Sequence, residues 1–132
     1  MKIKTTNLDR LFSQYIRTKA GFICKACGVQ KDKNHTDCAH IFGRRSRSTR
    51  WLEDNAVCLC KACHFYYTER PHDWNDITLE WLGEKRLGEV RLLFNTGVGP
   101  KDTEKEKIGL DLIDKIKAMG EQPVCGIGKR KS

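Results

Sequence analysis

Two Cys-x-x-Cys pairs are the residues whose type and spacing most directly indicate chemistry in this chain. The pairs are Cys24 with Cys27 and Cys60 with Cys63. Two thiolates at this spacing can reach one ion from a single tight turn, and four thiolates close a tetrahedral Zn²⁺ site without an open position. Gly28 follows the first pair, as a tight turn favours. The pattern predicts a structural zinc ion whose binding energy contributes to folding.

The chain has three further cysteines, one of which could change the set of zinc ligands, and a redox role is the alternative to zinc binding. Cys58 lies two positions before Cys60 and could compete with it as a ligand. Cys38 is expected to be a small buried residue, and Cys125 a free thiol in the C-terminal tail. A redox disulfide within the first pair is the other interpretation, but two pairs favour zinc over a single redox motif.

Two histidines and an asparagine form a second set of candidate residues. His40 and Asn55 lie between the cysteine pairs, and His64 directly follows the second pair in CKACH. A neutral imidazole, with a pKa of about 6.5, can accept a proton at pH 7. His40 could therefore act as a general base, although a hydrogen-bonded histidine within a hairpin is the structural alternative.

Short strands and a helix must position these side chains, as hydrophobic patterning and turn residues indicate. The expected order is a short strand that leads into the first metal turn within 22–28, a strand at 35–42, a basic loop at 43–51, a strand at 55–60, and a helix within 61–70 that Pro71 ends. This order would place His40 and His64 in one cleft, with zinc holding the helix from behind.

Longer amphipathic helices are expected on both sides of this core. Helices are predicted over residues 6–19, over 77–94 with a break near Gly83, and over 103–119. Their apolar stripes are formed by Leu8, Leu11, Phe12, Tyr15 and Ile16, by Ile77, Trp81, Leu82, Leu87, Val90 and Leu93, and by Ile108, Leu112, Ile113, Ile116 and Met119. The last stripe is expected to join the core, and a homodimer face is the alternative.

The motifs CKAC, AHIFGRR and DNAVCLCKACH, in this order, resemble the HNH endonuclease family, which has a ββα-metal fold. The resemblance is strongest to NinG-like recombination proteins of phages and to small phage HNH nucleases, and it covers about residues 22–67. It implies a small α+β fold, with a ββα-metal core over about 22–70 inside a nuclease domain of residues 1–95. Residues 96–132 would add a linker, a helix and a basic tail.

The resemblance also implies the activity and a role for each matching residue. The activity would be metal-dependent hydrolysis of DNA phosphodiester bonds, which leaves 5′-phosphates, in phage recombination, packaging or DNA processing. His40 matches the general base that activates water, and His64 a ligand of a catalytic Mg²⁺ or Mn²⁺ ion. Asn55 matches the residue that shapes the loop and orients His40.

The second ligand of the catalytic ion departs from the family pattern. Many HNH nucleases place it immediately before the general base, where this chain has Ala39. Asp37 lies on the same strand face as Ala39, one strand step of roughly 6.6 Å away. Asp37 is therefore the expected second ligand, and His35, further along that face, is the alternative.

The loop between the two expected hairpin strands carries four arginines and no acid. They are Arg44, Arg45, Arg47 and Arg50. Each phosphate that a cation neutralises releases a counterion, so the loop favours contacts to the DNA backbone over contacts to bases. A solvated basic loop is the alternative. Trp51 is expected to pack in the core and not to stack on a base.

The bulk properties agree with a small basic domain. The chain has 132 residues and a net charge of +8, with a pI of about 9.2. This charge suits DNA first and an anionic membrane surface second, and the tail GKRKS would add a non-specific DNA tether. Recombination or packaging proteins of phage or host are further expected partners.

The compartment is expected to be the cytoplasm, or the host cytoplasm for a phage-encoded protein. No apolar run is long enough to span a bilayer, and MKIKTTNLDR lacks the apolar core of a signal peptide. Seven cysteines in a reducing compartment are then metal ligands or free thiols. The rival to the nuclease is a non-catalytic zinc module that binds DNA or a protein.

Overall fold

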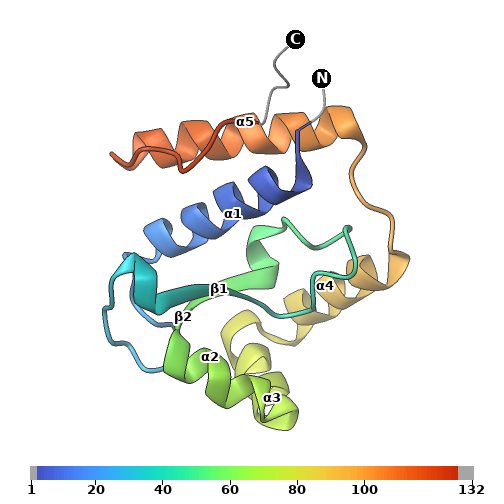
Figure 1. Cartoon of the computed structure of the whole chain (residues 1–132). Helices are drawn as coiled ribbons and strands as arrows, with labels where there is room; N and C mark the ends of the chain where they lie inside the picture. Colours follow the sequence, from blue (N-terminus) through green and yellow to red (C-terminus); the bar gives the residue numbers. More distant parts are fainter. Residues whose placement is uncertain (1–2, 128–132) are drawn as a thin grey trace.

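Helices surround one short β-hairpin in residues 3–127, the part of the chain that the computed structural model describes (Figure 1). This part is a small α+β fold with five α-helices and a two-stranded antiparallel sheet. The elements are α1 (Thr5–Lys19), the 3₁₀ turn η1 (Lys33–His35), β1 (Thr36–His40), the 3₁₀ turn η2 (Glu53–Asn55), β2 (Ala56–Cys60), α2 (Lys61–Thr68), α3 (Pro71–Leu82), α4 (Glu84–Thr96) and α5 (Asp102–Ala118). The expected basic tail, GKRKS, lies outside the described residues.

The hairpin divides the core into two apolar clusters. Cys38 pairs with Cys58, and His40 with Ala56. Because side chains alternate between the two faces of a strand, one face of the hairpin meets α1 and the other meets α2. Cys38 packs into the cluster on the α1 side, whereas its neighbour Ala39 belongs to the cluster on the α2 side.

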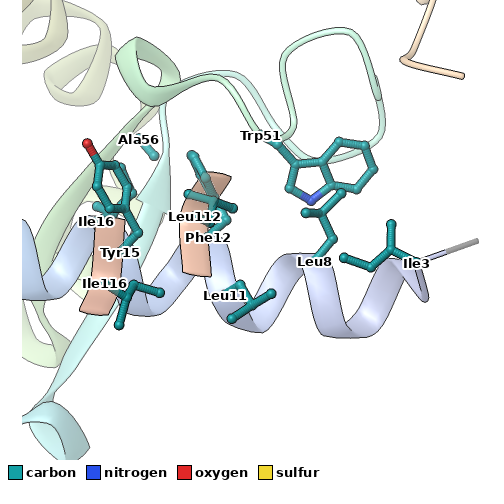
Figure 2. Packing of buried hydrophobic residues seen from close by; sticks show 10 residues of the cluster. All are labelled: Ile3, Leu8, Leu11, Phe12, Tyr15, Ile16, Trp51, Ala56, Leu112 and Ile116. Atoms are coloured by element: carbon teal, nitrogen blue, oxygen red, sulfur yellow. The ribbon is translucent and has the colours of Figure 1, made fainter. Parts of the chain in front are cut away.

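The first cluster joins α1 to α5 and to the hairpin, as Figure 2 shows. Its buried members are Ile3, Leu8, Leu11, Phe12, Tyr15, Ile16, Trp51, Ala56, Leu112 and Ile116. The predicted stripe of α1 is thus confirmed, and so is the packing of Trp51. The α5 stripe contributes to the same core through Leu112 and Ile116, while Met119 is exposed.

The second cluster is built around the zinc-type cysteines. Cys24, Ala39, Leu59 and Cys60 are buried together, and aromatic side chains of α2 and α3 cover them. These aromatic residues are Tyr67, Trp74 and Trp81. Four small or medium buried side chains make a thin core, so this half of the molecule has little apolar burial of its own.

The prediction for residues 22–28 is confirmed for the tight turn, but the short strand before the turn is reduced to a single bridge. In the described residues this segment forms one isolated bridge, between Ile23 and Gln30, and then turns. The N–H of Gly28 donates to the carbonyl of Cys24 at 2.8 Å. Gly28 has a φ of +75°, a left-handed conformation that glycine adopts without a steric penalty. The local sequence therefore folds as a tight turn that carries the first cysteine pair.

The boundaries of the helices after β2 also differ from the prediction. The helix α2 ends at Thr68, and Pro71 is the first residue of α3. Proline suits this position because its missing N–H would have no partner in the first turn. The predicted break at Gly83 is confirmed, since Gly83 has a φ of +83° and separates α3 from α4.

Candidate functional site

The four cysteines of the two pairs meet where β2 ends and α2 begins. The sulfur atoms of Cys24, Cys27, Cys60 and Cys63 all lie within 4.8 Å of one another. Those of Cys27 and Cys60 are 3.9 Å apart. In a tetrahedral site with Zn–S bonds of about 2.3 Å, neighbouring sulfurs are separated by about 3.8 Å. The cluster could therefore hold one structural metal ion, as the two spacings predict.

Backbone N–H groups of the two turns point at these sulfur atoms. The N–H of Cys27 donates to Cys24 Sγ at 3.5 Å, and that of Cys63 donates to Cys60 Sγ at 3.4 Å. Burial would raise the pKa of Cys24, but backbone donors outweigh burial and lower this pKa to about 7. Thiolates are the form that binds metal, so the first turn favours the ionised state at Cys24, whereas burial and the neighbouring thiols raise the pKa of Cys63.

The remaining cysteines stand apart from this cluster. Cys58 is buried, and burial raises its pKa to about 11; it does not belong to the four-sulfur group. Burial likewise raises the pKa of Cys38 to about 12, as suits an inert thiol. Cys125 packs against the first cluster and donates to the carbonyl of Asn7 at 3.6 Å, so its thiol is held against α1.

A cleft of about 620 Å³ runs along the outer side of β1, and the predicted residues gather there. The lining comes from α1, η1, β1, α2 and the first residues of the basic loop, with none from β2. It comprises Asp9, Ser13, Arg17, Lys33, Thr36, Asp37, Cys38, His40, Gly43, Arg44, Lys61 and His64. His40 and His64 thus face one hollow, and both also line an adjoining smaller one of about 80 Å³.

One ring nitrogen of His40 makes a hydrogen bond to the loop, and the other ring nitrogen is available to accept a proton. Its Nε2 lies 2.8 Å from the carbonyl oxygen of Arg50. A carbonyl only accepts, so Nε2 carries the hydrogen and Nδ1 of the neutral ring is an acceptor. Burial lowers the pKa of His40 and outweighs the hydrogen bond to the Arg50 carbonyl, which raises it. The cations of Arg44 and Arg50 lower this pKa further, whereas Asp9 opposes them. The imidazole is therefore neutral at pH 7.

Asn55 fastens the loop that supplies this carbonyl. Its side chain is fully buried. Its Oδ1 accepts from the N–H of Phe42 at 2.8 Å, and its Nδ2 donates to the carbonyls of Phe42 and Thr49 at 2.9 and 3.0 Å. Thr49 immediately precedes Arg50, whose carbonyl accepts from His40. Asn55 therefore acts on His40 through the loop and without direct contact.

Asp37 and His64 meet across the cleft from β1 and α2. His64 Nδ1 donates to Asp37 Oδ2 at 2.9 Å, and Lys61 Nζ donates to Asp37 Oδ1 at 2.8 Å. Burial would raise the pKa of Asp37, but the contacts with Lys61 and His64 outweigh it and lower that pKa. His35 does not line the cleft; it is exposed and contacts Asp32 at 2.7 Å.

The four arginines of the loop occupy different environments. Arg44, Arg45 and Arg47 are exposed. Arg50 is half-buried, and its Nε and Nη2 bind the two carboxylate oxygens of Asp9 at 3.0 and 2.5 Å. A guanidinium held this way is already neutralised, so Arg50 serves to attach the loop to α1.

Asp9 and Lys61 are two charged residues of the cleft to which the sequence analysis gave no role. Asp9 receives Arg50 and also the indole N–H of Trp51, at 2.8 Å. Both acceptor contacts depend on how α1 crosses the loop, and no local spacing encodes that crossing. For Lys61 a signal existed, since it lies one helical turn before His64, where side chains share a helix face.

Comparison of the chain with protein-family models, with curated proteins and with solved structures gives no match. Within residues 3–127, no helix combines the length and the apolar character that crossing a membrane requires.

Proposed function

We propose that this protein is a metal-dependent endonuclease of the HNH type that hydrolyses phosphodiester bonds in DNA. The observation that carries the proposal is the shared cleft, which holds a neutral histidine beside a contacting histidine–carboxylate pair. The strand–strand–helix order of β1, β2 and α2 agrees with a ββα core, and the sequence resemblance supplies the family.

His40 would act as the general base of the reaction. Its Nδ1 has no hydrogen bond within the described residues, whereas Nε2 is fixed by the Arg50 carbonyl. A water in the cleft could donate its proton to Nδ1 while its oxygen attacks phosphorus. The low pKa keeps the base unprotonated at neutral pH, and Asn55 keeps the loop carbonyl in place.

Asp37 and His64 would hold the divalent cation. Their contacting atoms are 2.9 Å apart, and adjacent ligands at 2.0–2.1 Å from an octahedral Mg²⁺ are separated by about 3 Å. Because Nδ1 donates its hydrogen to Asp37, it would have to lose that hydrogen before both atoms could bind one ion. When bound, such an ion supplies neutralisation of the scissile phosphate and of the leaving 3′-oxygen. If His64 binds through Nε2 instead, Asp37 orients its ring from Nδ1, as carboxylates commonly do for metal-binding histidines.

The zinc cluster and the basic loop would have supporting roles. The four-cysteine site has no open position and lies directly before His64 in the chain, so it would fix the start of α2 and leave the chemistry to other residues. Arg44 lines the cleft, the exposed Arg45 and Arg47 follow it in the loop, and all three would bind phosphates of the substrate.

Plasmid nicking tests the proposal directly. Zinc-loaded protein incubated with supercoiled plasmid and Mg²⁺ or Mn²⁺ is expected to produce nicked DNA with 5′-phosphates. His40→Ala should lower the rate by at least about a hundredfold, the usual contribution of a general base. His72→Ala is the matched control, because His72 is exposed on α3 and does not line the cleft.

A non-catalytic zinc module is the second candidate, and the Lys61 contact favours it. The ammonium of Lys61 neutralises Asp37 without any metal ion, which makes the pair a self-sufficient ionic contact. Intact plasmid in parent and His40→Ala protein alike, across several divalent cations, would support this candidate and exclude the nuclease.

A further inference from the structure

We propose that the nucleic-acid-binding surface continues from the basic loop onto α4, where Arg91, Arg45 and Arg47 hold backbone phosphates of the DNA that flanks the cleft. The inference rests on the proposed function, because it takes DNA as the ligand. It gives a role to Arg91, which lies outside the motifs of the hairpin.

The basic loop is fastened to the end of α4. Ser46 Oγ donates to the carbonyl of Phe94 at 2.7 Å, and Ser48 Oγ donates to the carbonyl of Leu93 at 2.6 Å. The last carbonyls of a helix have no partner within the helix, so these hydroxyls satisfy them. The loop and the last turn of α4 therefore present their side chains as one surface.

Two guanidiniums are stacked on a pair of aromatic rings at this junction. The rings of Phe42 and Phe94 are 5.4 Å apart. The guanidinium of Arg45 lies 4.7 Å from the centre of the Phe94 ring, and that of Arg91 lies 5.7 Å from the centre of the Phe42 ring. Stacking restrains a guanidinium through its flat face and leaves its N–H donors available for phosphate oxygens.

Acidic side chains do not neutralise the arginines of this surface, although they neutralise other arginines nearby. Arg50 is paired with Asp9, and Arg86, on the same helix as Arg91, is paired with Asp54 at 2.6 Å. Within residues 3–127, Arg45, Arg47 and Arg91 are exposed and make no ion pair. Uncompensated cations that are already ordered favour a ligand with regularly spaced negative charges, such as a nucleic-acid backbone.

The surface also adjoins the proposed catalytic cleft. Arg44 lines the cleft, and Arg45 is the next residue in the chain. A strand with one phosphate near His40 could therefore continue past Arg44 to the stacked guanidiniums. Contacts of this kind fix the register of the substrate without reading its sequence.

Salt-dependent DNA binding tests the inference. In a His40→Ala background, which blocks cutting, the affinity for a labelled duplex is measured by fluorescence anisotropy between about 50 and 200 mM salt. Arg91→Gln is expected to weaken binding about threefold to tenfold and to reduce the slope of log K against log salt by about 0.9, the value for one phosphate contact. Arg86→Gln is the matched control on the same helix and should change both quantities little.

Further variants and ligands separate the remaining outcomes. Arg91→Lys keeps the charge, so it should retain most of the salt slope; a loss equal to that of Arg91→Gln would indicate a structural stack and overturn the proposal. An unchanged affinity and slope for Arg91→Gln would also overturn it, as would equally tight binding of polyglutamate, which would indicate an acidic protein partner. Because cutting is not measured, a protein that binds through Arg91 but nicks no plasmid refutes the nuclease alone.

Discussion

At the scale of single residues, the environment of His40 determines how activity should depend on pH. A general base works only in its neutral form, and burial holds the pKa of His40 below its usual value of about 6.5. The nicking rate should therefore fall as the pH is lowered, with the midpoint of this acidic limb below about 6.5. The measurement is kcat/KM for nicking as a function of pH at constant ionic strength.

The sign of this dependence follows from the groups that face the ring. Burial is the largest cause and lowers the pKa, and the cations of Arg44 and Arg50 add to it. The hydrogen bond to the Arg50 carbonyl and the carboxylate of Asp9 act against burial without reversing it. A midpoint of the acidic limb above about 6.5 would mean that the charged form is favoured in the cleft, and His40 could not be the base as described.

The residues that sequence spacing could predict are those whose roles are encoded locally. A Cys-x-x-Cys pair brings two thiolates together in one turn whatever the rest of the fold does. The four-sulfur cluster could therefore be predicted from the sequence. The role of Asp9 could not be predicted, because Asp9 binds Arg50 of the basic loop, which lies 41 residues away in the sequence. Lys61 is an intermediate case, because its place one helical turn before His64 was visible in the sequence but its contact with Asp37 was not.

At the scale of elements, the order of strands and helix was predictable, but the junctions between them were not. Hydrophobic patterning located β1, β2, α1 and α5 to within a few residues. The sequence predicted the turn within 22–28, but it did not show that the strand before the turn would be reduced to one bridge between Ile23 and Gln30. Nor did it show that the basic loop would dock on the end of α4 through two serines.

The linker between α4 and α5 supplies a prediction at this scale. It passes so close to the basic loop that a Cβ on Gly99 would lie 2.6 Å from Arg47 Cβ and 3.5 Å from the Arg47 backbone carbon. Gly99→Ala must therefore displace the linker or the loop, and a loss of about 1–3 kcal/mol in the free energy of unfolding is expected. Urea denaturation followed by circular dichroism measures it.

Gly88 offers the matched control for this substitution. It lies within α4, and nothing is within 4 Å of the position that its Cβ would take. Gly88→Ala should stabilise the protein by up to about 1 kcal/mol, because alanine favours a helix over glycine. If Gly99→Ala is as stable as the parent, the close packing of the linker on the loop is not maintained in solution.

At the scale of the whole molecule, the two core clusters differ in what stabilises them. The first is a broad apolar interface of α1, α5 and the hairpin, with ten buried residues. The second has only Cys24, Ala39, Leu59 and Cys60 fully within it. Two of these four belong to the cysteine cluster that could hold a metal ion. We therefore expect the half of the protein that carries α2 and His64 to depend on a bound metal far more than the half that carries α1.

Metal removal should consequently affect the two halves unequally. We expect one zinc ion per chain by elemental analysis, and loss of cooperative unfolding of α2, α3 and α4 when it is chelated, since zinc binding contributes on the order of 10 kcal/mol in small domains. Amide hydrogen exchange should then show lost protection around Leu59 and Trp74 and retained protection at Leu11 and Ile116.

Cys27→Ser should reproduce the effect of chelation, whereas Cys125→Ser, outside the cluster, should not. Uniform protection after chelation would show that the thin second core is stable without an ion, and the four sulfurs would then have no structural task that requires metal.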